Sequence, residues 1–252
     1  GFTQLWHEVE GLDVGYRGHN RFVSIGLSIG REDCPVPAEG MDWIPTLQPI
    51  MLEHWPVARQ ITRKALTTVA NWRGYGSVDF DGRFYGQKAH SLRPFFDVPL
   101  QTDEKFVLAL SIHPEEKPDL EQLGRCGWQL LDPASVAATP EAFQKFVQGS
   151  KAEFGFAKSG YVEANCGWFS DRSICYLASG RPVIAQETGF SDYLPTGEGL
   201  LAYKTREELL ASIFALNSDY THHCAAARQL AESHFDSRVV LTRLLRNIGA
   251  RQ

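Results

Sequence analysis

The sequence predicts an α/β fold: a Rossmann-like, mostly parallel sheet with helices on both faces, preceded by an irregular proline-rich arm. From residue 65 onward, short apolar runs alternate with segments of helical length, and such alternation produces parallel sheets with right-handed crossovers. Five of the 13 prolines lie between residues 35 and 56, before this alternation begins. A glycine loop, a short helix, a buried strand and a second glycine loop then follow one another over residues 165–190.

The composition is that of an ordinary globular protein with one large or two small domains. Of the 252 residues, 43% are hydrophobic and 22% are charged, and the net charge is -5. A mildly acidic chain argues against non-specific nucleic-acid binding, which depends on basic surface. No apolar run approaches the roughly 20 residues that span a bilayer, so we expect no membrane span. No signal peptide is visible, and the start at Gly1 indicates a processed or truncated chain.

The five cysteines are odd in number and irregularly spaced, and none belongs to a Cys-x-x-Cys pair. This pattern favours free thiols in a reducing environment over a disulfide framework. The histidines show no metal-binding spacing with nearby carboxylates. We therefore expect a cytoplasmic protein without a metal site.

Residues 1–60 differ from the rest of the chain. A short strand-like run covers residues 22–29, and the prolines that follow fix φ and remove amide donors. This part is therefore predicted to be an extended connector anchored by Trp43 and Trp55, rather than a helix or a central strand. The chain divides into a segment over 1–60, a Rossmann-like domain over 61–235 and a C-terminal helix over 236–252.

The elements of the Rossmann-like domain follow from local patterns. Short apolar runs predict strands over 67–70, 106–112, 128–131, 154–157, 182–185 and 200–203. Helices are predicted near 88–96, 119–123, 140–148 and 170–178, from 205 onward, and over 219–232 and 237–248. Pro140 suits the first position of its helix, and Thr205 with Glu208 forms a capping box.

The helix near residue 170 is the candidate site. Ser170, Asp171 and Ser173 are candidate caps, since each offers a side-chain oxygen to a free amide of the first turn. Unpaired amides at a helix start form an anion site of the kind that holds phosphates. A loop at the carboxyl end of a parallel strand, beside such a helix, is where open α/β sheets bind nucleotides. By shape alone, a helix–strand pair without a ligand explains the pattern equally well.

Four segments in this region together resemble the donor-binding domain of GT-B glycosyltransferases, and one of them, Glu-Thr-Gly-Phe-Ser-Asp at 187–192, stands where that family has its second donor-binding loop. Asn-Cys-Gly-Trp-Phe-Ser at 165–170 is similar to the family's His-Cys-Gly-Trp-Asn-Ser. Ala-Ser-Gly-Arg-Pro-Val-Ile-Ala at 178–185 resembles its Ala-x-Gly-x-Pro-Val-Ile-Ala, and Glu-Gly-Leu-Leu at 198–201 its Gly-x-Gly-Leu-Leu. The match covers roughly residues 153–245. It implies the C-terminal domain of a GT-B enzyme, with 1–60 as the end of an N-terminal domain plus connector, and most of that acceptor-binding domain missing.

The resemblance also implies roles for individual residues. Lys158 would neutralise the diphosphate of a nucleotide-sugar donor, and Arg73 would contact its phosphates. From the residues themselves, Trp168 and Phe169 flank the glycine turn and are candidates for stacking on a base or sugar, with a place in the core as the alternative. Arg172 lies in the presumed phosphate helix, with pairing to Asp171 or Glu187 as the alternative to a phosphate contact. The implied donor-binding residues are Arg73, Lys158, Gly167, Trp168, Phe169, Ser170, Asp171, Arg172, Glu187, Thr188, Gly189 and Phe190.

One position departs from the family pattern. Many members carry a glutamate for the ribose hydroxyls where this chain has Cys175, and Glu187 or Asp192 are possible substitutes. We expect sugar transfer from a nucleoside-diphosphate sugar to an acceptor that the sequence does not identify, with no cofactor and no metal. The catalytic base is unknown. Two alternatives stay open: a nucleotide-sugar epimerase of the same fold, and a nucleotide-sugar-binding module without activity.

Overall fold

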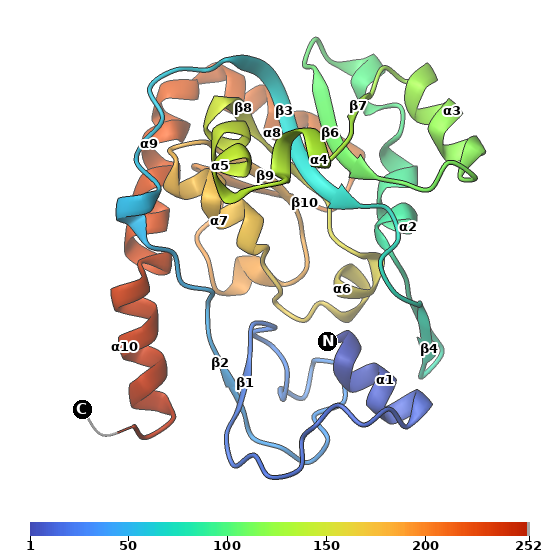
Figure 1. The fold of residues 1–252 in the computed structure, drawn as a ribbon, viewed down its shortest axis with the longest axis vertical. Helices are drawn as coiled ribbons and strands as arrows, with labels where there is room; N and C mark the ends of the chain where they lie inside the picture. The colour runs from blue at the N-terminus through green and yellow to red at the C-terminus, as the bar shows by residue number, and fades with distance from the viewer. Residues whose placement is uncertain (251–252) are drawn as a thin grey trace.

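A six-stranded parallel sheet forms the centre of the computed structural model, which describes residues 1–250 (Figure 1). The strand order is β10-β9-β8-β3-β6-β7, and every neighbouring pair is parallel. The strands are β3 (Arg63–Asn71), β6 (Phe106–Ser111), β7 (Gln129–Leu131), β8 (Ser150–Gly155), β9 (Val183–Gln186) and β10 (Leu200–Tyr203). The α/β fold with a parallel sheet, predicted from the alternating pattern, is confirmed.

The order in which the strands are added to the sheet reverses beside β3. The chain passes from β3 to β6 and β7 on one side, then returns to place β8 on the other side of β3. The connections leaving β3 and β8 therefore diverge at the carboxyl ends of these strands. Such a reversal is the usual place for ligands in open α/β sheets.

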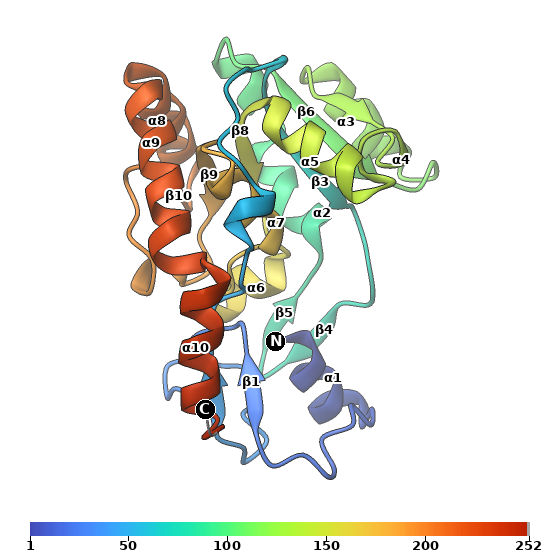
Figure 2. The same cartoon turned by 60° about the vertical axis from the view of Figure 1, so that its left-hand side comes forward.

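Helices cover both faces of the sheet (Figures 1 and 2). On one face, residues of α2 (Lys88–Leu92), α3 (Lys117–Arg125) and α8 (Arg206–Ser218) share a core with β6. On the other face, α5 (Pro140–Gly149), α7 (Asp171–Ala178) and α9 (Tyr220–Leu230) share a second core with β9. The capping box expected at Thr205 and Glu208 is present at the start of α8.

The largest shift in a predicted strand is at β8. The apolar run predicted a strand over 154–157, whereas β8 begins at Ser150 and ends at Gly155. Ser150 is completely buried, and its hydroxyl accepts a 2.7 Å hydrogen bond from Thr67 and donates one to the carbonyl of Phe146. A polar residue can enter the sheet because these partners satisfy it, and an apolar pattern does not detect that.

The remaining elements of the sheet domain are short. They are η1 (Leu52–His54), η2 (Arg93–Phe95), η3 (Val98–Gln101), α4 (Ala134–Ala137), α6 (Ser159–Ala164), η4 (Phe190–Asp192) and the π-helical turn η5 (Ala231–Phe235). The helix predicted over 219–232 therefore ends as α-helix at Leu230 and continues as η5.

The N-terminal residues form a small lobe with a core of its own. It contains α1 (Phe2–Glu10), the parallel pair β1 (Phe22–Ser24) and β2 (Trp43–Pro45), and packs against the hairpin of β4 (Val78–Phe80) and β5 (Arg83–Tyr85). Helix α1 was not predicted. The strand expected over 22–29 stops at residue 24, because the Ser24 hydroxyl accepts a hydrogen bond from the Gly26 amide and the chain turns.

Helix α10 (Ser237–Asn247) leaves the sheet domain and runs beside the N-terminal lobe (Figure 2). Arg21 of the lobe donates a 3.2 Å hydrogen bond to the carbonyl of Ile248. The predicted C-terminal helix over 236–252 extends past the described residues at positions 251 and 252. No helix within residues 1–250 is both long and apolar enough to cross a membrane.

Candidate functional site

A pocket opens at the carboxyl ends of β8 and β9, beside the first turn of α7. The volume that a water-sized sphere can occupy is about 10 Å³, so the pocket is a shallow depression open to solvent. Ala157 and Gln186 line it from the strand ends, and Ser170, Arg172 and Ser173 line it from the start of α7. The pocket therefore lies at the carboxyl edge of the parallel sheet, between β8 and β9, one strand away from the reversal between β3 and β8.

The first turn of α7 presents free backbone donors. Ser170 is the N-cap residue with φ -80°, but its side chain makes no capping hydrogen bond; of the three predicted candidates, it is Asp171 whose side chain accepts from a first-turn amide. Only the Arg172 amide is bonded, to Asp171 Oδ1 at 2.9 Å. Among residues 1–250, the amides of Ser170, Asp171 and Ser173 donate to no acceptor. Together with the helix dipole, these amides favour an anion.

Arg172 forms a buried ion pair with a residue that the sequence did not suggest. Its Nε lies 2.5 Å from Glu153 Oε1, and its Nη1 donates to the Val69 carbonyl at 3.0 Å. Arg172 therefore pairs with neither Asp171 nor Glu187, the two partners considered as an alternative from the sequence. Glu153 lies on β8 under α7, so the partner comes from the strand below the helix.

The two glycine loops that the sequence singled out lie together. The Gly167 amide donates to the Thr188 carbonyl at 2.7 Å, and the Thr188 hydroxyl donates to the Trp168 carbonyl. Gly189 has φ 91°, and a Cβ atom there would meet the Asn165 carbonyl oxygen at 2.7 Å. Only glycine fits this approach between the loops.

Glu187 organises the second of these loops. Its Oε1 accepts hydrogen bonds from the amides of Thr188 at 2.9 Å and Gly189 at 2.6 Å. The residue is 5% exposed. Its carboxylate thus holds the loop conformation. A role in binding sugar hydroxyls stays a prediction, and Oε2 is the carboxylate oxygen available for that role.

The predicted aromatic contacts divide into core and pocket rim. Phe169 is 2% exposed and packs its ring on Phe190 and Phe235 within the second core. Trp168 is half-buried and stacks on Tyr161 with 4.6 Å between ring centroids. Of the two rings proposed to stack on a base or sugar, only that of Trp168 keeps an accessible surface.

Lys158 lies in an aromatic environment. Its Nζ sits 3.2 Å from the ring centroid of Tyr75 and 5.1 Å from that of Phe2. Burial lowers the pKa of the Lys158 ammonium, while Tyr75 opposes this effect. The cation is therefore held over rings of the N-terminal lobe and the loop after β3, and contact with a diphosphate stays a prediction.

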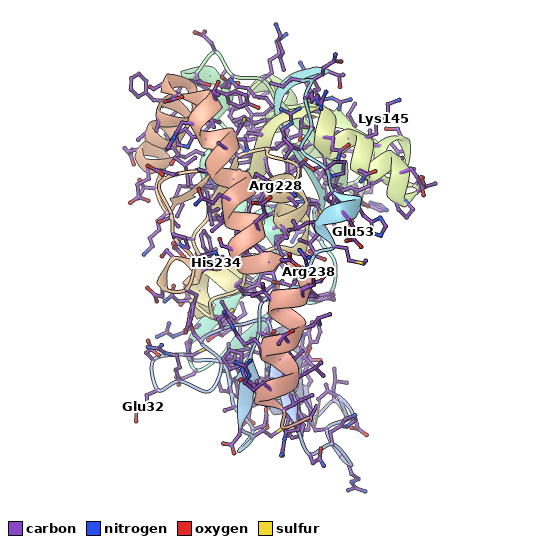
Figure 3. All side chains as sticks on the ribbon, turned by 90° about the vertical axis from the view of Figure 1, so that its left-hand side faces the viewer. Glu32, Glu53, Lys145, Arg228, His234 and Arg238 are labelled. Atoms are coloured by element: carbon purple, nitrogen blue, oxygen red, sulfur yellow. The ribbon has the colours of Figure 1, made fainter. Side chains whose placement is uncertain are left out.

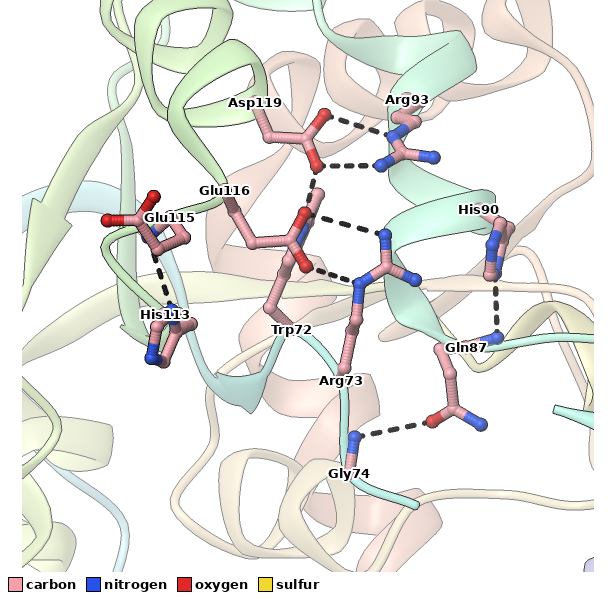
Figure 4. Close-up of polar contacts among 10 residues, drawn as sticks. All are labelled: Trp72, Arg73, Gly74, Gln87, His90, Arg93, His113, Glu115, Glu116 and Asp119. Carbon is pink, nitrogen blue, oxygen red and sulfur yellow. Dashed lines mark hydrogen bonds and ion pairs between the residues drawn. The ribbon is translucent and has the colours of Figure 1, made fainter. Parts of the chain in front are cut away.

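Arg73 is engaged on the protein surface, as Figure 4 shows. Its guanidinium forms an ion pair with Glu116. Close to this pair, Asp119 accepts hydrogen bonds from Arg93 at 2.8 and 3.0 Å and from the Trp72 indole at 2.9 Å. Burial alone would raise the pKa of the Asp119 carboxyl, but the Arg93 and Trp72 bonds lower it below its ordinary value. The structure does not bring Arg73 to the pocket.

Lys88 is a cation of this region that sequence reasoning missed. It is the first residue of α2, and its Nζ lies 5.4 Å from the ring centroid of Phe156, a residue that lines the pocket. Burial, and next the charge of Arg172, keep the pKa of the Lys88 ammonium well below its usual range. One signal was available: a lysine in the first turn opposes the helix dipole, so such a position is unfavourable without an anion.

The position of the family's ribose glutamate holds a thiol. Cys175 lines a neighbouring cavity with Trp55 and Phe143, and its Sγ contacts the Asp171 carbonyl at 3.5 Å. Burial raises the pKa of this thiol to about 12. In the described part of the chain, no group of three His, Cys, Asp or Glu side chains could hold a metal ion.

Searches against protein-family models and against curated proteins found no match. Solved structures are similar to this chain. For TarM the TM-score is 0.55 at 14% identity, over 83% of this chain and 39% of TarM. For Anabaena HepE in complex with UDP and glucose it is 0.57 at 10% identity, over 86% of this chain and 59% of HepE.

A third solved structure, sucrose-phosphate synthase from Thermosynechococcus elongatus, has a TM-score of 0.54 at 14% identity, over 84% of this chain and 54% of that enzyme. The chain thus spans between 39% and 59% of the length of these three proteins. The fold of this chain is therefore of the GT-B type, which it shares with the matched parts of these three structures.

Proposed function

We propose that this chain is the donor-binding part of a glycosyltransferase that uses a nucleoside-diphosphate sugar. The observation that carries the proposal is the pocket at the carboxyl ends of β8 and β9, which is lined by Arg172 and by first-turn residues of α7 whose amides have no acceptor. The bound UDP of HepE supports a nucleoside diphosphate as the ligand class. We propose that an N-terminal domain completes the enzyme and supplies the acceptor-binding site and the catalytic base.

The chemistry of the site suits a diphosphate leaving group. Sugar transfer releases a nucleoside diphosphate, so negative charge develops on the phosphate oxygen as the glycosidic bond breaks. Fixed amide donors and cations near that oxygen stabilise the charge without reorganising. We propose that Arg172, Lys88 and the α7 amides do this, with Lys158 as a further cation and no divalent metal.

The test is calorimetric titration of the chain with UDP, ADP and GDP, each with and without a chelator. We expect binding of at least one nucleoside diphosphate that persists in the chelator, since the donors are amides and basic side chains. The corresponding nucleoside is the control, and it should bind more weakly because it lacks the anion. Strict dependence on magnesium, or no binding of any diphosphate, would refute the proposal.

A nucleotide-sugar-binding module without activity is the second candidate, and Cys175 favours it. The thiol is a poor hydrogen-bond partner for ribose hydroxyls compared with a carboxylate. Release of nucleoside diphosphate, measured in the full-length protein and in its Cys175→Glu variant, separates the two readings. A module would bind the donor without releasing nucleoside diphosphate, whereas a transferase would release it in the presence of acceptor.

The five cysteines are all free, which supports our further proposal of a cytoplasmic location.

A further inference from the structure

A charged residue lies under the proposed donor pocket. Glu153 sits in the middle of β8 with 0% exposure. Its Oε1 pairs with Arg172, while its Oε2 has no hydrogen-bond partner among the described residues. Removing a carboxylate from water costs several kcal/mol in order of magnitude, so a buried pair is poor evidence for stability alone. A reason other than stability is needed for Glu153.

The carboxylate fixes the direction of the Arg172 side chain. Glu153 holds Nε at 2.5 Å, and the Val69 carbonyl of β3 holds Nη1 at 3.0 Å. Because a guanidinium is planar, two fixed nitrogens determine where the third lies. Nη2 donates to no residue within 1–250, and Arg172 lines the pocket. The pair therefore leaves one guanidinium nitrogen without a partner on a residue that lines the pocket.

A further basic side chain lies near this pair. Lys88 Nζ sits 5.4 Å from the ring centroid of Phe156, which lines the pocket together with Arg172. Lys88 Nζ forms no ion pair or hydrogen bond with a described residue.

We propose that Glu153 is a positioning residue of the donor site, which fixes the Arg172 guanidinium so that its unpartnered Nη2 is available to the diphosphate of the donor. The inference rests on the proposed function for the identity of the ligand, but it concerns how the anion is held. It assigns Glu153 no contact with the donor. Its effect on binding passes through the direction of the Arg172 guanidinium.

The experiment compares Glu153→Gln with a matched control, Glu104→Gln. Glu104 pairs with Lys151, also on β8, in a half-buried ion pair that does not line the pocket. Calorimetry measures the affinity of each variant for UDP, inorganic pyrophosphate and uridine, and urea unfolding measures stability. We expect E153Q to weaken UDP and pyrophosphate binding by about tenfold or more, as for loss of a charge-assisted hydrogen bond, and to leave uridine binding unchanged. E104Q should leave all three affinities unchanged.

A second variant keeps the test decisive if E153Q does not fold. Glu153→Asp retains the charge but draws the carboxylate back from Arg172 Nε, so it should also weaken UDP and pyrophosphate binding about tenfold. Unchanged affinities in folded E153Q or in folded E153D would overturn the inference while leaving the proposed function intact. Binding of pyrophosphate but not of UDP by the unmodified chain would overturn the proposed function while leaving the inference intact. Binding of neither probe would overturn both.

Discussion

Ser170 occupies the N-cap position of α7 without acting as a side-chain cap. The sequence placed a serine at the helix start, as N-cap preferences predict, and the helix does begin there. The hydroxyl, however, accepts no hydrogen bond from the first turn. The backbone amide of Ser170, rather than its hydroxyl, is therefore the group available to a phosphate.

Replacing Ser170 separates these two groups. Ser170→Pro removes the amide, and its φ of -80° is compatible with proline, so the variant should fold. We expect UDP binding to weaken about tenfold or more, since a hydrogen bond to a charged phosphate is lost. Ser170→Ala keeps the amide and should bind UDP normally, with a free energy of unfolding within about 1 kcal/mol of the unmodified chain. Titration of both variants measures this. Normal binding by folded S170P would show that the amide is not used.

Three elements meet at the carboxylate of Asp119. It lies on α3 and accepts hydrogen bonds from Arg93 of η2 and from Trp72, which follows β3. Because its pKa is lowered in the folded state, its contribution to stability is present above the unfolded pKa of about 3.9. The contribution is lost as the pH falls through the lower, folded pKa. These hydrogen bonds join the carboxyl end of β3 to α3 and η2 on one face of the sheet.

We expect Arg93→Met to reduce the free energy of unfolding by about 2 kcal/mol at pH 7, because Asp119 loses its charged partner. The loss should shrink below about pH 4, where Asp119 is protonated in the unfolded chain. Urea unfolding between pH 3 and pH 7 measures both effects. Arg83→Met, which breaks an exposed pair with Glu163, is the control and should change little at any pH. A pH-independent loss in R93M would contradict the account.

At the scale of the whole molecule, the linker segment (residues 51–62) is held to the sheet domain at several points. Arg228 of α9 donates to the Trp55 carbonyl at 2.8 Å, and Gln148 of α5 donates to the Pro56 carbonyl at 3.1 Å. The Ala58 amide donates to the Ser179 carbonyl at 3.0 Å. Figure 3 labels Glu53 of this segment together with Arg228 of α9 and Arg238 of α10. Irregular backbone here is thus fixed by side chains rather than by strands.

Limited proteolysis with trypsin should therefore spare the linker segment at first. Cleavage needs a stretch of backbone to open, and each hydrogen bond opposes opening. We expect cuts at Arg17 or Arg31, which lie in exposed loops of the N-terminal lobe, before any cut at Arg59. Mass spectrometry of early fragments identifies the sites, and the urea-unfolded chain, cut at all three, is the control. A first cut at Arg59 would show that these bonds do not restrain the segment.

Much of the sheet domain was predictable because its pattern is local. Each of the six predicted strands has a counterpart in the sheet, and β10 has the predicted bounds. The capping box of α8 and the helix start at Ser170 follow from neighbouring residues in the chain. Helix α1 was missed because its burial depends on a lobe core built from distant residues, including Tyr85 and Cys166.

The candidate site divides along the same line. Amino-acid order alone determined that a glycine loop, a helix start and a second loop would adjoin a parallel strand, since each feature depends on residues a few positions apart. Only the tertiary structure decided that Arg172 pairs with Glu153, that Lys88 joins them from α2, and that Arg73 is engaged elsewhere. The physical reason is that buried charges find partners through space, so their pairing depends on which strands and helices pack together rather than on spacing along the chain.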